Sequence, residues 1–233
     1  MERTDLFRFS GHRSGCKSRH TYHLTHSQMF FDDDDRVYLT VSRLLPYRKT
    51  DNEEFRAVIW GTEIDLATGD SLHRPILLRE SHHSRKCAEG PHIYKKDGWY
   101  YLLVAEGGNV LDHQVRMARS KSPLGPYEEP PHGCNPFLFN GHHHPDVQST
   151  GHADLIQDTN GYWWAFFLAI RTQSNGIAPL GRECWFTPLV WETDQWPVFN
   201  NGQTVELQVL TSLLPPQQSS SGWIDDFQTG MST

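Results

Sequence analysis

Ala88-Glu89-Gly90-Pro91-His92 is the stretch that decides the fold, because the same position recurs along the chain at equal intervals. Glu89 lies 63 residues after His26 and 63 residues before His152. A polar turn and then aromatic or β-branched residues follow each of these positions, in the segments Asp33–Tyr38, Lys96–Tyr101 and Thr159–Trp164. A fixed period without gaps is the signature of a repeat architecture.

Each repeat is predicted to hold a strand, a polar turn and an aromatic strand, followed by two further strands. The further strands are expected over Phe55–Asp65 and His73–Arg79 in the first repeat and over Gln114–Ser120 in the second. Four antiparallel strands repeated radially describe the blade of a β-propeller, so the fold class is all-β. The first strand of every blade lines the central channel, so the residues at positions 26, 89 and 152 are expected to converge. The alternative is a coincidence of three aromatic hairpins.

The sequence divides into three parts. Residues 1–25 show no strand alternation and are expected to be irregular, whereas residues 26–212 form the propeller. Within the propeller, Trp196–Asn200 and Val205–Leu207 resemble a last, partial blade. Residues 213–233 begin with a linker rich in proline, glutamine and serine.

Composition argues against several classes of function. The chain has 233 residues, of which 37% are hydrophobic, which suffices for one all-β domain. A net charge of −7 without a block of Lys or Arg gives no support for a nucleic-acid partner. No apolar run reaches about 18 residues, so no membrane span is predicted. The four cysteines lack CxxC spacing, which indicates neither a zinc knuckle nor a redox motif. The sequence does not indicate an oligomeric state.

Two polar runs invite a metal hypothesis. Asp32–Asp35 lacks the alternating ligands and the closing Glu of an EF-hand, so we expect a solvated turn there. His142–His144 places three imidazoles in a row, and adjacent side chains of an extended segment point to opposite sides. We therefore expect a polar loop at this position, with metal binding as the alternative.

Several motifs, taken in order, resemble glycoside hydrolase family 43, and in particular its β-xylosidase and α-L-arabinofuranosidase branch. They are Glu89–His92, Tyr100–Leu102, Ala105–Gly108, Ala118–Ser122, Gly125–Tyr127, Thr150–Leu155 and Leu180–Glu183. The resemblance covers about residues 27–212 and implies a five-bladed β-propeller. A β-sandwich domain commonly follows the propeller in this branch, and the tail from Gly222 resembles the beginning of one.

The resemblance implies an inverting hydrolase that acts on saccharides containing xylose or arabinose and requires no cofactor. Its acid and base must stand roughly 6.5–9.5 Å apart to leave room for a water molecule. Glu89 matches the general acid, and His152 matches a histidine of the pocket floor that lies near a metal ion or water, with Ca²⁺ as the candidate ion. Arg182 matches an arginine that reaches the sugar. Glu106 and His113 are further pocket candidates. The alternatives are exposed turn positions for Glu89, Glu106 and His113, a buried core position for His152 and a structural ion pair for Arg182.

Two departures from the family pattern stand out. His26, a candidate substrate contact, occupies the place of the aspartate that orients the acid. A histidinium there favours the ionised form of a neighbouring carboxyl, which is the wrong direction for a general acid. The base-bearing blade would precede His26 by one period, before Met1, and five blades of this period need about 315 residues. The first blade is therefore expected to be missing, and a chain truncated at both ends or a mis-spliced gene is the corresponding hypothesis.

These departures leave two functions in competition. One is the hydrolase with Glu89 as acid, and the other is a non-catalytic propeller that at most binds sugar. A metal-dependent hydrolase that uses the His-rich loop is a third hypothesis. The family's substrates suggest an extracellular protein, although the N-terminus lacks the apolar region of a secretory signal.

Overall fold

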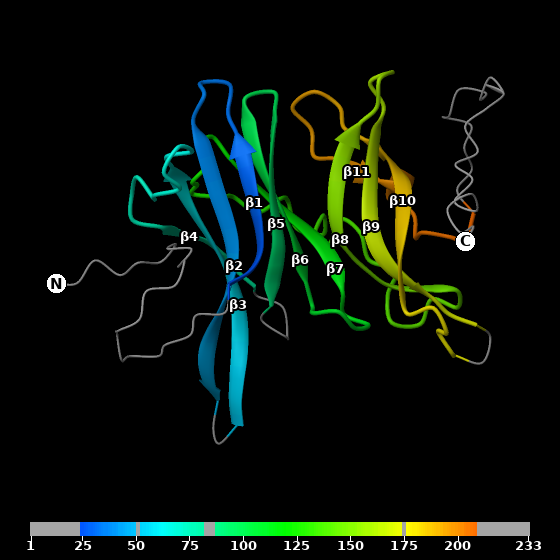
Figure 1. The fold of residues 1–233 in the computed structure, drawn as a ribbon. Helices are drawn as coiled ribbons and strands as arrows, with labels where there is room; N and C mark the ends of the chain where they lie inside the picture. Colours follow the sequence, from blue (N-terminus) through cyan, green and yellow to red (C-terminus); the bar gives the residue numbers. More distant parts are fainter. Residues whose placement is uncertain (1–23, 50–51, 82–86, 174–175, 209–233) are drawn as a thin grey trace, which may run out of the picture.

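The computed structural model describes residues 24–49, 52–81, 87–173 and 176–208, and these residues form three antiparallel sheets (Figure 1). The first sheet contains β1 (Leu24–Phe31), β2 (Val37–Lys49), β3 (Asn52–Ile64) and β4 (Ile76–Glu80). The second contains β5 (Ala88–Lys96), β6 (Trp99–Glu106) and β7 (Gln114–Ser120). The third contains β8 (Val147–Gln157), β9 (Trp163–Arg171), β10 (Arg182–Val190) and β11 (Val198–Phe199), and a 3-10 turn (Asn200–Gly202) follows.

The predicted repeat is confirmed in the order of the strands, although the second sheet has three strands in the described part of the chain and not the predicted four. Each sheet is built from consecutive strands, and β1, β5 and β8 each stand at one edge of their sheet. β5 contacts both β1 and β8, so the first strands of the three sheets are neighbours. Figure 1 shows the sheets side by side in sequence order. This radial succession of antiparallel sheets is the blade arrangement of a β-propeller.

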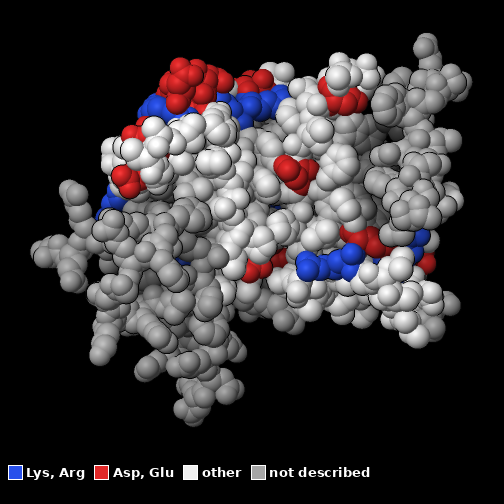
Figure 2. All heavy atoms as spheres, viewed as in Figure 1, with Lys and Arg blue, Asp and Glu red and all other residues white. Residues whose placement is uncertain are grey.

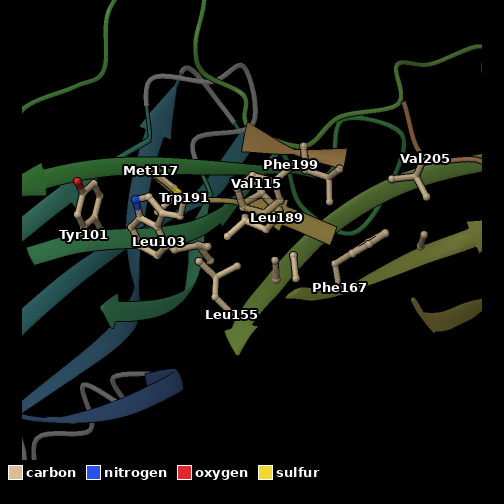
Figure 3. Close-up of a cluster of buried hydrophobic side chains, with 14 of the residues drawn as sticks. Tyr101, Leu103, Val115, Met117, Leu155, Phe167, Leu189, Trp191, Phe199 and Val205 are labelled. Carbon is tan, nitrogen blue, oxygen red and sulfur yellow. The ribbon is translucent and has the colours of Figure 1, made fainter. Parts of the chain in front are cut away.

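The core lies between the sheets. The sequence of β6 is almost continuously apolar because both faces of this strand are covered. Its even-numbered residues, among them Leu102 and Val104, pack with Ile59 of the first sheet and Ile93 of β5. Its odd-numbered residues face the third sheet, where they join the larger cluster drawn in Figure 3. That cluster includes Tyr101, Leu103, Val115, Met117, Leu155, Phe167, Leu189, Trp191, Phe199 and Val205. A strand covered on both faces buries every side chain, so its hydrophobic pattern loses the alternation of a half-exposed strand.

The prediction of a last, partial blade is wrong. Val198 and Phe199 pair with Val190 and Leu189, so β11 is the outer strand of the third sheet. The chain between β10 and β11 is short, and a short connection favours antiparallel pairing with the preceding strand. Val205 lies outside any strand. It is buried and held by Asn140, whose side chain exchanges hydrogen bonds of 2.9 and 2.7 Å with the Val205 backbone.

The acidic run between β1 and β2 is only partly the solvated turn that the sequence predicts. Residues 33–35 are exposed, but Asp32 is buried. Its carboxylate accepts hydrogen bonds from the Tyr100 hydroxyl at 2.6 Å and from the Lys95 ammonium. Burial alone would raise the pKa of Asp32, but these hydrogen bonds outweigh it and lower the pKa. Figure 2 shows acidic atoms gathered at this turn with basic atoms beside them.

Candidate functional site

A β-bulge interrupts each first strand at the repeat position. The strand pairing shifts between Thr25 and Ser27 on β1, between Glu89 and His92 on β5, and between Gly151 and Asp154 on β8. Within these bulges three residues have left-handed backbone conformations: His26 (φ 49°), Gly90 (φ 53°) and His152 (φ 55°). A bulge redirects the side chains near it. Since the left-handed region is uncommon for residues other than glycine, two histidines there mark a strained and potentially functional position.

These bulges bring His26, His152 and the residue after Glu89 together. The His26 and His152 rings meet edge to face, with centroids 4.9 Å apart. Gly90 lies directly against His152, because a Cβ atom added at Gly90 would stand 2.5 Å from His152 Nε2. Glu89 itself is half-buried and pairs with Ala105 of β6. Within the described part of the chain, no hydrogen bond or ion pair engages the Glu89 carboxylate.

His113 joins the same group from the residue before β7. It is buried, so the alternative of an exposed turn position is wrong. Its Nδ1 donates to the Ser149 carbonyl at 3.0 Å, and this bond fixes the neutral tautomer with a free lone pair on Nε2. A Cβ atom added at Gly151 would stand 2.5 Å from the His113 ring. A glycine immediately before His152 therefore leaves room for the imidazole of His113.

His92 is a member of this group that sequence analysis did not assign as a site residue. Its Nδ1 lies 3.8 Å from Asp154 of β8, and Asp154 also accepts a hydrogen bond from the Tyr94 hydroxyl. The Leu155 backbone N–H donates to that hydroxyl at 2.9 Å. His92 is the last residue of the stretch Ala88–His92, which sequence analysis had singled out. The sequence does not show, however, that β8 would place the Asp154 carboxylate opposite the His92 imidazole.

Burial and charge repulsion lower the pKa values of three of these imidazoles, those of His152, His113 and His92. Burial, together with charge repulsion from His26, His92, His113 and Arg182, lowers the pKa of His152 to about 4. Burial also lowers the pKa of His113, and the Arg182 charge adds to this effect. The pKa of His92 is lowered by burial and by His26, against the attraction of Asp154. Arg182, exposed at the start of β10, thus acts electrostatically on the same cluster.

These shifts predict a loss of stability in mild acid. The unfolded chain exposes the imidazoles, whose pKa is then about 6.5, so between pH 6.5 and 4 it binds more protons than the folded chain. The stabilisation is complete above pH 6.5 and is lost as the pH falls through this window. We expect the free energy of unfolding to drop by about 2 kcal/mol between pH 7 and pH 4.5, after allowance for partial exposure.

Urea titrations at the two pH values measure this change. The lowered pKa of Asp32 affects stability only below about pH 3.8, its ordinary pKa, and therefore outside the range from pH 6.5 to pH 4. A His152→Gln variant is expected to lose part of the pH dependence. An identical dependence in that variant would contradict the assignment of the effect to His152.

Glu106 belongs to a different arrangement from the histidines. It is 1% exposed, so its alternative as an exposed turn residue is also wrong. Arg79 Nε donates to Oε1 and Ser81 Oγ donates to Oε2, each at 2.7 Å, and Arg116 Nε lies 3.7 Å from Oε2. Both oxygens thus accept bonds from the protein, which joins the first sheet to the second. This arrangement gives no support to the prediction that Glu106 contacts a sugar.

Two histidines of the loop His142–His144 contact two separate carboxylates. His142 Nε2 lies 2.6 Å from Asp112 Oδ1, and His144 Nε2 lies 3.4 Å from Glu206 Oε1. Among the residues that the structure describes, no group of three or more His, Cys, Asp or Glu is arranged to hold a metal ion. Calcium binds six to eight oxygen ligands, and Ca²⁺ near His152 stays a prediction.

Comparisons with known proteins agree with this architecture. A model of the glycosyl hydrolases family 43 matches residues 24–197. A non-reducing end α-L-arabinofuranosidase of Bacteroides ovatus is 43% identical over 129 residues, covering 54% of this chain and 24% of the relative. A xylosidase/arabinosidase of Butyrivibrio fibrisolvens is 38% identical over 183 residues, covering 75% of this chain and 33% of the relative.

The solved structure of a xylan β-1,4-xylosidase of Bacillus halodurans matches with a TM-score of 0.69 and 32% identity. The match covers 82% of this chain and 36% of that one. The chain therefore spans about a quarter to a third of the length of these relatives. The similar structures are five-bladed β-propellers, and this chain accounts for part of such a ring. Among the described residues, no helix has the length and apolar character needed to cross a membrane.

Proposed function

Because this chain belongs to glycoside hydrolase family 43, we propose that it hydrolyses glycosidic bonds in saccharides containing xylose or arabinose, with inversion and with Glu89 as general acid. The observation that carries the proposal is the position of Glu89. It lies on an inner strand, beside the Gly90 that contacts His152, and no described residue engages its carboxylate. Such saccharides are abundant in plant cell walls, so we also propose an extracellular site of action.

Three described side chains are assigned a part in this chemistry. Glu89 donates a proton to the leaving oxygen, and the inverting mechanism also needs a carboxylate base on the opposite face of the sugar, to which no described residue is assigned. Neutral His152 accepts a hydrogen bond from a sugar hydroxyl, because its ring stays unprotonated near pH 7. The fixed fork of donors on Arg182 suits a pair of hydroxyls.

A second function remains in competition, and His26 favours it. A histidine stands where the family has an orienting aspartate, so the acid lacks that partner. Loss of one member of a catalytic group commonly lowers the rate by orders of magnitude. On this alternative the chain binds sugar and turns it over weakly or not at all.

A Glu89→Gln variant distinguishes the two functions. Hydrolysis of an aryl β-xyloside and an aryl α-arabinofuranoside by the 233-residue chain is expected to fall at least about 100-fold, since amide cannot donate the acidic proton. Glu192→Gln, which changes an exposed glutamate, is the matched control and should retain the rate. A rate unaffected by Glu89→Gln refutes the acid role. No turnover together with calorimetric sugar binding supports the binding protein.

A further inference from the structure

We propose that His113 is a positioning residue for the candidate sugar site: its imidazole supports the bulges of β8 and so holds His152 against Gly90, beside Glu89. This inference rests on the proposed function, because it takes His152 as a contact of the saccharide. It adds a residue that acts on the saccharide through His152. A series of contacts leads from the residue before β7, across β8, to the bulge of β5.

Two bulges follow one another in β8. The pairing of β8 with β9 shifts between Gln148 and Gly151 and again between Gly151 and Asp154. Each shift sets three steps along β8 against two steps along β9, so each bulge holds one extra residue. Each bulge also contains a left-handed residue that is not a glycine, Ser149 at φ 55° and His152 at φ 55°. Such conformations persist only where the surrounding residues determine them, so this segment needs a support.

His113 supports the first of these bulges. Ser149 is buried and lies within the shifted pairing, where a bulge disrupts the hydrogen bonds of the ladder. A buried carbonyl needs a donor, and His113 Nδ1 donates to the Ser149 carbonyl at 3.0 Å. The imidazole also lies against the backbone of Gly151, where an added Cβ atom would stand 2.5 Å from the ring. The His113 ring therefore contacts β8 on both sides of Thr150.

The connection between β6 and β7 holds His113 in place. It folds tightly on itself, because a Cβ atom added at Gly107 would collide with the Asp112 carbonyl. The His113 backbone N–H donates to the Val110 carbonyl at 2.9 Å. His113 is 3% exposed, whereas His152 is only partly buried. This difference assigns the sugar contact to His152 and the positioning role to His113.

The second bulge transmits this support to His152. His152 follows Gly151 directly, and its ring contacts His26 and Gly90, the neighbour of Glu89. A change in the course of the backbone at Gly151 therefore moves the imidazole to which the proposed function assigns a sugar hydroxyl. Loss of one such hydrogen bond weakens binding about three- to tenfold. Because the bond is present before and during the reaction, its loss raises KM and leaves kcat nearly unchanged.

His113→Leu and His113→Asn, made in the 233-residue chain, separate the hydrogen bond from the ring. Both remove the imidazole, but the amide nitrogen of asparagine lies as many bonds from the backbone as Nδ1 and can still donate to the Ser149 carbonyl. His113→Leu is expected to raise KM for an aryl β-xyloside, or the calorimetric Kd where turnover is weak, about three- to tenfold. The value of kcat should change less than about twofold, and His113→Asn should recover most of the original KM.

His144→Leu is the matched control. It removes another histidine that bonds the backbone, since His144 Nδ1 accepts the Val147 N–H at 3.1 Å, but His144 precedes both bulges of β8. It should leave KM unchanged.

An NMR measurement tests the placement of His152 without turnover. The nuclear Overhauser effect between the His152 ring and the Gly90 α-protons is expected in the original chain and in His113→Asn, and should weaken in His113→Leu. Gly151→Ala is a second variant with the same expected result, and it serves if His113→Leu does not fold. Gly151 is not left-handed, so the added methyl group acts by displacing the His113 ring.

Three results would overturn the inference. The first is that the Overhauser effect and KM keep their original values in His113→Leu and Gly151→Ala. The second is that His113→Asn is impaired as much as His113→Leu, and the third is that kcat falls at unchanged KM. If the original chain neither hydrolyses nor binds the xyloside, the proposed function fails, while the Overhauser comparison still decides whether His113 places His152.

Discussion

Replacing Arg79 by methionine is expected to lower the free energy of unfolding by about 3–5 kcal/mol, because it leaves the Glu106 carboxylate buried without its main partner. Arg79 and Glu106 are 6% and 1% exposed at their side chains, and their contact joins β4 to the end of β6. Arg79 also pairs with Glu129, so the variant removes the centre of a network. Ser81 and the more distant Arg116 compensate only in part. Urea denaturation followed by tryptophan fluorescence measures the loss.

Two companion variants test the reason for this loss. In Arg79→Met/Glu106→Met, both charges are gone, so the double variant should be more stable than Arg79→Met alone. Arg171→Met removes an exposed ion pair and should cost less than about 1 kcal/mol. A double variant that is less stable than the single one would show that packing, and not the uncompensated charge, causes the effect.

Gly90→Ala is expected to destabilise the protein by about 2–6 kcal/mol and to displace the imidazole of His152. Two costs add: a left-handed backbone at φ 53° costs a non-glycine residue about 1–3 kcal/mol, and overpacking costs about as much again. The overpacking arises because the new Cβ would stand 2.5 Å from His152 Nε2. Since the His26–His152 contact would change, the pKa of His152 is expected to move away from about 4, as NMR can measure.

Gly98→Ala is the matched control for this prediction. Gly98 lies in the same sheet, in the turn before β6, at φ 72°, and a Cβ there meets nothing within 4 Å. The Gly98→Ala variant therefore measures the cost of the left-handed backbone conformation alone, about 1–3 kcal/mol. Equal losses in the two variants, with an unchanged pKa of His152, would mean that the His152 ring moves aside freely and that Gly90 does not fix its place.

The order of the strands follows from local sequence. Strands with aromatic and β-branched residues are punctuated by Asp- and Gly-containing turns, and these signals depend only on residues near one another in the chain. Hence Gln114–Ser120 was predicted with the bounds that the structure gives β7. The same period placed His26 and His152 at equivalent positions of β1 and β8, which lie beside one another in the fold.

Contacts between sheets depend on residues that lie far apart in the sequence. Whether Asp32 is solvated or buried depends on Tyr100 and Lys95, which come from the next blade. Likewise, the partners of Glu106 come from β4, and the short connection after β10 returns β11 to the third sheet. No pattern within a single strand encodes these partners.

The amino-acid sequence by itself determined the repeating sheet, the inner position of the first strands and the family resemblance, because strand periodicity and turn chemistry are local properties. Only the tertiary structure decided which polar side chains became neighbours. It separated Glu106, held in a buried ion pair, from His113, and it added His92 to the histidine cluster. The physical reason is that burial, ion pairing and pKa depend on groups about one blade apart in sequence, which meet only when the sheets pack.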